Sequence, residues 1–558
     1  MEQLPALRGE KSPAGWLRGS FLLASPFALF LTLAGGTPQA AGFTLPPPVP
    51  PLPPPSGNVI NVSTATQLQN AVDALSSNTT ILIAPGTYQL TQTLRIRGGI
   101  SNVALRGATN NRDDVVLLGS GMRTSGAVDI CVTGEDAADI LIANLSIGEA
   151  FYHPIQLKGE LGCDRVRLYN LRLFDAGEQF VKGTVDFANP NGVDNGTVEY
   201  CVIEYTTVGP DDGYTNGVDI HDGANWVIRY NLFRNIRGPA AAPLTGPAVL
   251  MWSGSSNTIC ESNTFIDCER SIAFGLGPQS GFAHGHQGGI IRNNFIYRAS
   301  TSTAHPDAGI SVWDSPGTEV LHNTVIQNGT YPNAIEYRFP GSTRVVIANN
   351  LTDGAIAQRD GASATLAGNL TNATPAFFVN PSIADLHLAA TATAAIDQGV
   401  NIADCPLDWD GQARPVGPAR DVGADEYRPV GAVAAGFHTV VPCRLIDTRN
   451  STGPLGGPAL SAANNRAFPL AGLCGIPPDA RALSVNVAAV TPTTGPGFFT
   501  LYPGGTPRPL FSTINYSGGQ IRANNAIVTL GAAGDVAVYC GQGSGTAHLV
   551  IDVNGYFQ

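Results

Sequence analysis

A short motif returns at nearly constant spacing through the middle of the chain. Each copy joins a strand-like apolar stretch to an asparagine, as in "YNLFRN" and "HNTVIQN". Successive asparagines are 26, 61, 32, 31, 29 and 27 residues apart, and the long gap equals two turns with Tyr200 at the missing position. The series consists of Asn144, Asn170, Asn231, Asn263, Asn294, Asn323 and Asn350. A period of about 30 residues with one group of strands per turn predicts a β-solenoid.

The same asparagines are expected to point inward at one corner and to stack their amides into a hydrogen-bonded ladder. Ahead of the repeats, "STATQLQNAVDAL" places a Ser/Thr cap before Leu68, Ala71, Val72 and Leu75, which share one helical face. "TILIAPGTYQL" then has the pattern of a strand, a Pro-Gly turn and a second strand. These features predict a solenoid that begins with a capping helix.

The first residues have the features of an export signal. Basic residues precede the apolar run "FLLASPFALFLTLAGG", and small residues follow it in "TPQAAG". We expect a signal peptide over residues 1–41 and a secreted protein, in the medium or at the cell surface, with an uncleaved anchor as the alternative. No later stretch is long and apolar enough to predict a membrane span. "LPPPVPPLPPPSG" predicts a stiff, extended proline-rich linker over residues 42–57.

The asparagine repeat stops well before the C-terminus. We expect the β-solenoid and its capping helix over residues 58–428. Residues 432–558 show alternating strands with Gly/Pro turns, which predict a second, smaller antiparallel domain of the β-sandwich type. The fold class is therefore all-β, and nothing in the sequence indicates an oligomer, so a monomer is expected.

Charge and cysteine content narrow the partners and the compartment. The net charge of −12 argues against nucleic acid, since phosphates need positive charge to neutralise them. Nine cysteines in an exported chain suggest disulfides, and the pairs we favour are Cys260 with Cys268 and Cys443 with Cys474. The alternative is that several cysteines are small buried hydrophobic residues.

The capping helix, "IAPGTYQL" and the asparagine corners resemble the right-handed parallel β-helix of pectate-lyase-like proteins. The end of this region, from "AAIDQGV" to "GADEY", resembles the closing segment of many secreted bacterial β-helix proteins. The C-terminal region resembles a recurrent module of such proteins, for which surface attachment, glycan binding or a passive cap are all open. The resemblance implies an acidic polysaccharide or a cell-surface glycan as the partner.

The strands that precede the asparagine corners supply the candidate site. Because side chains alternate along a strand, two outward columns are expected on this face. The first column is Lys158, Lys182, His221, Trp252, Gly275, Trp313 and Arg338. The second column is Gln156, Phe180, Asp219, Leu250, Ala273, Ser311 and Glu336.

Lys158 and Lys182 are the only lysines after Lys11, in a chain rich in arginine. On the alignment above they lie side by side, about 4.8 Å apart, and their like charges are expected to lower the pKa of at least one of them. A neutral lysine can accept a proton, which an arginine cannot do at ordinary pH. The alternative is that both lysines only make the surface soluble.

The columns together predict a groove for an anionic polysaccharide that is cleaved by β-elimination. Lys182 and His221 are the candidate base and acid, and Arg338 is the candidate group that binds the substrate carboxylate. The remaining substrate-binding candidates, of which the tryptophans offer flat faces to sugar rings, are Lys158, Trp252, Trp313 and Glu336.

"GPDDGYTNGVDIHDG" contains Asp211, Asp212, Asp219 and Asp222, which predict a calcium site, since Ca²⁺ takes oxygen ligands. The alternative is that they are ordinary turn carboxylates. Asp219 and Asp222 are also candidates for the acid and base of a glycoside hydrolase. A third function is non-catalytic glycan binding. The sequence shows no complete catalytic motif of the known lyases, and "GVDIHDG" only echoes their Asp-His pattern.

Overall fold

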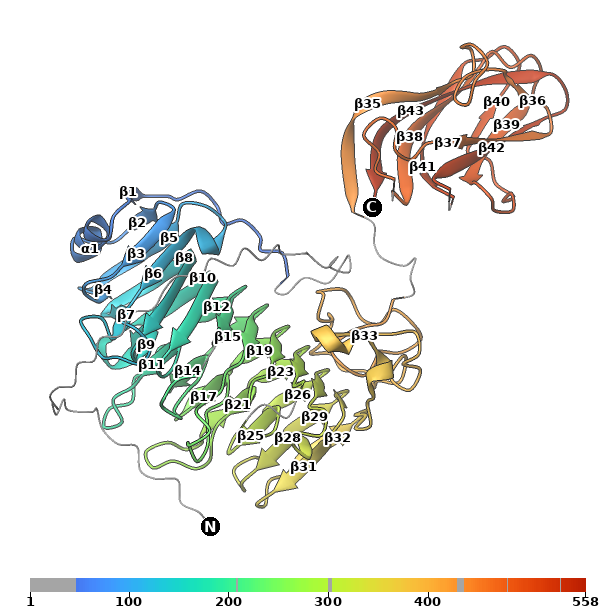
Figure 1. Cartoon of the computed structure of the whole chain (residues 1–558). Coiled ribbons are helices and arrows are strands. Elements are labelled where there is room, and N and C mark those ends of the chain that lie inside the picture. The colour runs from blue at the N-terminus through green and yellow to red at the C-terminus, as the bar shows by residue number, and fades with distance from the viewer. Residues whose placement is uncertain (1–46, 207–208, 300–303, 429–435, 479, 532) are drawn as a thin grey trace, which may run out of the picture.

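The computed structural model describes residues 47–206, 209–299, 304–428, 436–478, 480–531 and 533–558. Its first part is a right-handed parallel β-helix whose strands stack turn upon turn (Figure 1). Its last part, from residue 436, is built from antiparallel sheets. The predicted all-β class is confirmed. The predicted signal peptide, residues 1–41, lies outside the described residues.

One face of the β-helix is a ten-stranded parallel sheet that carries the candidate site. Its strands, in spatial order, are β4 (Leu94–Ile96), β7 (Ile130–Glu135), β9 (His153–Lys158), β11 (Val181–Thr184), β14 (Val218–His221), β17 (Val249–Trp252), β21 (Ile272–Phe274), β25 (Ile310–Trp313), β28 (Asn333–Arg338) and β31 (Ala355–Arg359). Residues that alternate along these strands fill the interior, as Ile220, Met251 and Phe274 do.

The other faces belong to two series of parallel strands that share the long strands β8 (Ala137–Ala150) and β10 (Asp164–Ala176). The first series adds β1 (Asn58–Val62), β2 (Thr79–Ile83), β5 (Ile100–Gly107), β12 (Thr197–Glu199), β15 (Val227–Arg229), β19 (Ile259–Glu261), β23 (Ile290–Arg292), β26 (Glu319–Leu321), β29 (Val345–Ala348) and β32 (Ala364–Ala367). The second adds β3 (Gly86–Gln89), β6 (Val115–Leu118), β13 (Val202–Glu204), β16 (Leu232–Arg234), β20 (Thr264–Ile266), β24 (Phe295–Tyr297), β27 (Thr324–Ile326) and β30 (Leu351–Thr352).

The first turn of the β-helix is covered by α1 (Ala65–Asp73). Thr64 caps this helix, since its side chain accepts a hydrogen bond from the Gln67 amide. Leu68, Ala71 and Val72 are buried against the interior, as the sequence predicts. The helix therefore closes the end of a solenoid whose core would otherwise face water.

The predicted asparagine ladder is present between the two outer series of strands. Amide-to-amide hydrogen bonds of 2.9–3.0 Å run from Asn231 through Asn263, Asn294, Asn323 and Asn350 to Asn369. Asn170 and Asn144 form a separate pair at 2.8 Å. The prediction for Tyr200 is off by one residue, because the residue next to Asn231 is Cys201, whose backbone amide donates to Asn231 Oδ1. Tyr200 instead has a positive φ of 57°, and its ring stacks on that of Tyr230.

The proline-rich segment is not a free spacer where it is described. The Pro53 carbonyl accepts a hydrogen bond from Arg106, and the Pro50 carbonyl accepts one of 2.6 Å from the Tyr169 hydroxyl. This segment therefore lies along the first turns of the β-helix. Among the helices that the structure describes, none has the length and apolarity that crossing a bilayer requires.

The C-terminal region packs two antiparallel sheets around a core of its own. One sheet contains β35 (Phe437–Asp447), β36 (Leu460–Ser461), β38 (Ala482–Val490), β41 (Arg522–Thr529) and β43 (Thr546–Phe557); the other contains β37 (Asn464–Pro469), β39 (Gly497–Pro503), β40 (Ile514–Tyr516) and β42 (Asp535–Gln542).

Of the two predicted disulfides, one is present. Cys443 and Cys474 are bonded, and this prediction is confirmed. Cys260 and Cys268 are free and buried inside the β-helix, so that pairing is wrong and the alternative of small buried hydrophobic residues holds.

Candidate functional site

The strand register corrects the alignment on which the two-lysine prediction rests. Lys182 on β11 is paired with Gln156 on β9, and Lys158 is paired with Thr184. The sequence alignment matched the two Lys-Gly pairs and therefore slipped by two residues, which keeps the face but changes the neighbours. Lys158 instead lies 3.1 Å from Glu135 Oε1 on β7. The two lysines are not side by side, and the predicted like-charge effect is wrong.

Lys182 is the centre of a buried cluster of polar side chains, the Lys182 cluster. Its Nζ donates to Asp219 Oδ2 at 2.5 Å, to the Tyr214 hydroxyl at 2.9 Å and to His221 Nε2 at 2.9 Å. Asp219 is next to Lys182 in the register of β14 and β11, and His221 follows two residues later on the same face. Lys182 is 7% exposed, His221 4% and Asp219 0%.

The hydrogen bonds of the Lys182 cluster assign its protons. Because the Lys182 ammonium donates to His221 Nε2, the His221 proton is on Nδ1, which lies 3.0 Å from Ser253 Oγ. Ser253 in turn donates to Gln279 Oε1 at 2.7 Å. Burial, followed by the Lys182 charge, lowers the pKa of His221 to about 3, so the imidazole is neutral.

Asp219 is fully matched by donors. Its Oδ2 accepts from Lys182 and from the Tyr214 hydroxyl at 2.9 Å, and its Oδ1 accepts from Trp252 Nε1 at 2.8 Å. Burial by itself would raise the pKa of Asp219, but the Lys182 charge and these hydrogen bonds lower it below its ordinary value. Lys182 Nζ is within hydrogen-bond distance of three partners inside the cluster, and its role as a base stays a prediction.

A pocket of about 760 Å³ lies against this cluster. Tyr214, Trp252 and Gln279 belong to both, because each lines the pocket and bonds a member of the cluster or its chain of hydrogen bonds. Loops around residues 211–213, 239–246 and 276–279 form most of the other walls, which are mostly apolar but include Asp211 and Asp212. Burial, then the Asp219 charge, raises the pKa of Tyr214 well above its ordinary value.

Arg270 also lines the pocket, and the sequence analysis missed it. Its side chain is 3% exposed and its Nε lies 3.0 Å from Asp307 Oδ2, without hydrogen-bond geometry. The guanidinium lies 4.8 Å from the centre of the Trp313 ring. Its Nη2 is buried and has no hydrogen-bond partner. Arg270 precedes β21, outside the strand pattern, so periodicity gave no signal for it.

The predicted carboxylate-binding residues lie elsewhere. Arg338 on β28 is four strands from β14, about 19 Å at the usual spacing of parallel strands. It is paired with Asp360 and lies over the Trp313 ring. Glu336 is 0% exposed and is paired with Arg359 at 3.0 Å. The structure therefore does not bring Arg338 and Glu336 to Lys182 and His221.

The two tryptophans are not open platforms for sugar rings. Trp252 is 5% exposed and Trp313 is 7% exposed, because loops and arginines cover the outer face of the sheet. Phe180, expected in an outward column, is in the hydrophobic core instead. The outward column is real from β14 onward; His221, Trp252, Gly275 and Trp313 in it are buried, whereas Arg338 is partly exposed.

The four aspartates predicted to hold calcium do not converge. Asp211 is 3.4 Å from Arg123, and Asp212 accepts from the Tyr214 amide at 2.8 Å. Asp219 is paired with Lys182, and Asp222 sits in a turn with a φ of 52°. Among the described residues, no three of these carboxylates place ligand atoms within 4.8 Å of one another. The hydrolase pair is also unsupported, since Asp219 has no exposed surface.

Comparisons with known proteins agree with the fold and go no further. No family profile and no curated protein matches the chain. Pectate lyase Pel9A is 14% identical, with 67% of this chain and 97% of that one covered and a TM-score of 0.38. The alginate lyase of Paenibacillus sp. str. FPU-7 is 16% identical, over 57% and 99% of the chains, with a TM-score of 0.34. PfbA, a surface adhesin of Streptococcus pneumoniae, is 10% identical, over 55% and 87%, with a TM-score of 0.30.

At these identities and at TM-scores below 0.5, the likeness carries no argument about this chain. The turn-by-turn pairing of parallel strands in the chain itself establishes a right-handed parallel β-helix, the fold of pectate-lyase-like proteins.

Proposed function

We propose that the protein binds an acidic polysaccharide in the pocket beside the Lys182 cluster. The observation that carries this proposal is the buried Nη2 of Arg270, which lines the pocket and has no hydrogen-bond partner. An unmatched buried N–H is costly, and a guanidinium matches the two oxygens of a carboxylate. A uronate carboxylate is a ligand of this kind.

The remaining walls suit the rest of a sugar chain. Tyr214 and the edge of Trp252 provide aromatic surface, and the apolar loops provide contact for the C–H faces of the rings. The Lys182 cluster holds both aromatic residues in place, since Asp219 accepts from Tyr214 and Trp252. In this proposal Lys182 and His221 are positioning residues and do not touch the ligand.

The test is binding of an oligouronate against a neutral oligosaccharide of equal length, by calorimetry. We expect the oligouronate to bind more tightly than the neutral ligand, and Arg270→Gln to weaken oligouronate binding at least tenfold. Arg344→Gln, at an exposed arginine of the β-helix outside the pocket, should leave that binding unchanged. Thermal unfolding of Arg270→Gln shows whether it folds, and Leu244→Arg, which fills the pocket from an exposed loop position, is the second variant. Equal binding of both ligands, or full binding by both variants, would overturn the proposal.

β-Elimination is a second candidate, and one observation favours it. Of the titratable members of the Lys182 cluster, Tyr214 alone lines the pocket, and its hydroxyl accepts from Lys182 and donates to Asp219, each at 2.9 Å. Elimination needs a base for the proton next to the carboxylate and an acid for the departing glycosidic oxygen. Tyr214 is the cluster group that would exchange a proton with the substrate.

Ultraviolet absorbance of the unsaturated product separates the two candidates. A rise on pectin, alginate or a glycosaminoglycan that is lost in Tyr214→Phe, with binding retained, would establish elimination. Binding without a rise, and without new reducing ends, would leave a glycan-binding protein. Repeating the assay with calcium and with a chelator tests the predicted calcium requirement.

We also propose that the protein is exported, because residues 1–41 contain the apolar run of an export signal.

A further inference from the structure

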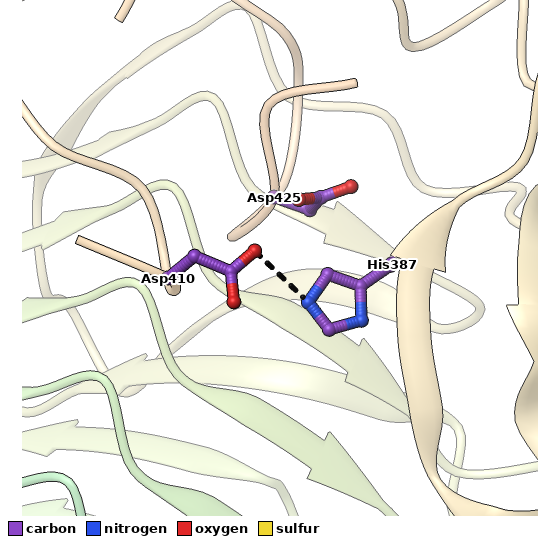
Figure 2. A group of neighbouring side chains, drawn as sticks. All are labelled: His387, Asp410 and Asp425. Atoms are coloured by element: carbon purple, nitrogen blue, oxygen red, sulfur yellow. Dashed lines mark ion pairs between the residues drawn. The ribbon is translucent and has the colours of Figure 1, made fainter. Parts of the chain in front are cut away.

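A second polar cluster lies in the closing segment of the β-helix, away from the residues of the pocket. His387 is on β34 (Asp385–Leu388), which pairs with β33 (Phe378–Asn380), and Asp410 and Asp425 come from the loops that follow. One ligand atom from each of the three side chains lies within 4.8 Å of the others. Figure 2 shows the three side chains turned toward one another, with His387 Nε2 and Asp410 Oδ2 at 3.2 Å.

The imidazole is held as metal-binding histidines are held. His387 Nδ1 lies 2.6 Å from Asp385 Oδ1, so one ring nitrogen is bonded to a carboxylate while the other faces Asp410 and Asp425. The ring stands edge-on to Phe295 at 5.3 Å and to Trp409 at 5.4 Å. Its orientation is thus fixed by packing as well as by the hydrogen bond.

Asp408 adds an independent observation. It is 1% exposed, and its Oδ1 accepts from the Gln412 amide at 2.7 Å, but its Oδ2 has no hydrogen-bond partner. Asp408 lies two residues before Asp410 on the same loop. A buried carboxylate oxygen without a donor is costly, and a cation bound at this loop is a partner that would offset that cost.

We propose that His387, Asp410 and Asp425 bind one divalent cation. One imidazole nitrogen with carboxylate oxygens suits zinc or manganese better than calcium, which takes oxygen ligands only. The ion joins β34 to two loops of the segment that closes the β-helix. Its effect is to stabilise that closure, because the ligands come from three separate stretches of chain.

The experiment is calorimetric titration of the chelator-treated full chain with Zn²⁺, Mn²⁺, Ca²⁺ and Mg²⁺, each alone, with thermal unfolding in parallel. We expect one equivalent of Zn²⁺ or Mn²⁺ to bind and to raise the unfolding temperature. Asp410→Asn should weaken binding at least tenfold. Asp404→Asn, at an exposed aspartate of the same segment that is outside the cluster, is the matched control and should bind as the wild type does.

Cobalt gives a second measurement, since the visible absorption of bound Co²⁺ reports nitrogen and oxygen ligands and should change in Asp410→Asn. Two results would overturn the proposal: none of the four ions binds the wild type, or both Asp410→Asn and Asp425→Asn bind as tightly as Asp404→Asn. The seven free cysteines are buried and do not compete for the ion in the folded chain. Arg270→Gln should keep full metal binding, so the metal site is tested independently of the proposed polysaccharide pocket.

Discussion

The Lys182 cluster and the His387 cluster contain similar residues and differ in how well their charges are matched. In the first, one ammonium faces one carboxylate, and Asp219 accepts from three donors. In the second, one imidazole lies near Asp385, Asp410 and Asp425, and Asp408 on the loop of Asp410 has an oxygen with no donor.

Burial makes this difference informative. A buried polar group is tolerated when it is paired, so a fully paired cluster is explained by the fold alone. An unpaired group is not explained in that way, and it marks the place where a ligand fits. The same reasoning separates Arg270, whose Nη2 has no partner although its Nε lies 3.0 Å from Asp307, from Lys182, whose Nζ is bonded to three groups.

The largest expected effect is on the pH dependence of stability. Burial, joined for His153 and His221 by the Lys182 charge, lowers the pKa of His153, His221 and His286 to about 3. Free histidine titrates near pH 6.5, so between about pH 6.5 and 3 the unfolded chain binds protons that the folded chain does not. Stability is therefore full above pH 6.5 and falls as the pH drops, by up to about 4 kcal/mol per pH unit for three groups.

Urea unfolding at pH 7, 6 and 5 measures this slope, and His286→Gln should reduce it by about 1.4 kcal/mol per pH unit.

His387 is expected to change stability with pH in the opposite sense. Burial alone would lower its pKa, but bonds to Asp385 and Asp410 raise it to about 11, so its contribution is present below pH 6.5 and lost as the pH rises toward 11. A flat profile between pH 7 and 5 would contradict the neutral, buried state of the three histidines.

The next effect concerns the matched pair in the first cluster. Lys182→Met leaves Asp219 buried with no counter-charge and should cost about 3–5 kcal/mol of unfolding free energy. Lys182→Met combined with Asp219→Leu should recover most of that loss, because no unpaired charge remains. Denaturant unfolding of the single and double variants checks this. A double variant as unstable as Lys182→Met would show that the pair does more than balance charge.

A smaller effect is expected one step along the hydrogen-bond chain. Ser253→Ala removes the acceptor of His221 Nδ1–H and leaves that buried donor unmatched, at a cost of about 1–3 kcal/mol. Ser253→Thr keeps the hydroxyl and is the control for loss of the group itself. If Ser253→Ala is as stable as the wild type, the proton assignment in the cluster is wrong.

The smallest effect belongs to the other lysine. Lys158 is partly exposed, and its buried partner Glu135, at 3.1 Å, is also paired with Arg95 at 2.7 Å. Lys158→Met leaves Glu135 with that second cation and should therefore change the unfolding free energy by about 0–1 kcal/mol. A loss comparable to that of Lys182→Met would contradict this role of Arg95.

The sequence predicted the fold well because the fold is periodic. From Asn231 to Asn350, each asparagine of the ladder makes the same amide hydrogen bond to the asparagine of the next turn. The inward position of Ile220 or Met251 follows from the alternation of side chains along a strand. It predicted the faces of Lys182 and His221 for the same reason. It could not fix the neighbour of Lys182, because a slip of two residues keeps every side chain on its face.

The sequence by itself determined the solenoid, its capping helix, the asparagine corner and an antiparallel C-terminal region, since each depends on short-range pattern. Only the tertiary structure decided which charges are matched. Arg270, Tyr214 and Gln279 lie outside the strand repeat, and Asp410 and Asp425 meet His387 through loops of irregular length. Pairing and burial depend on contacts between distant segments, and no local pattern encodes them.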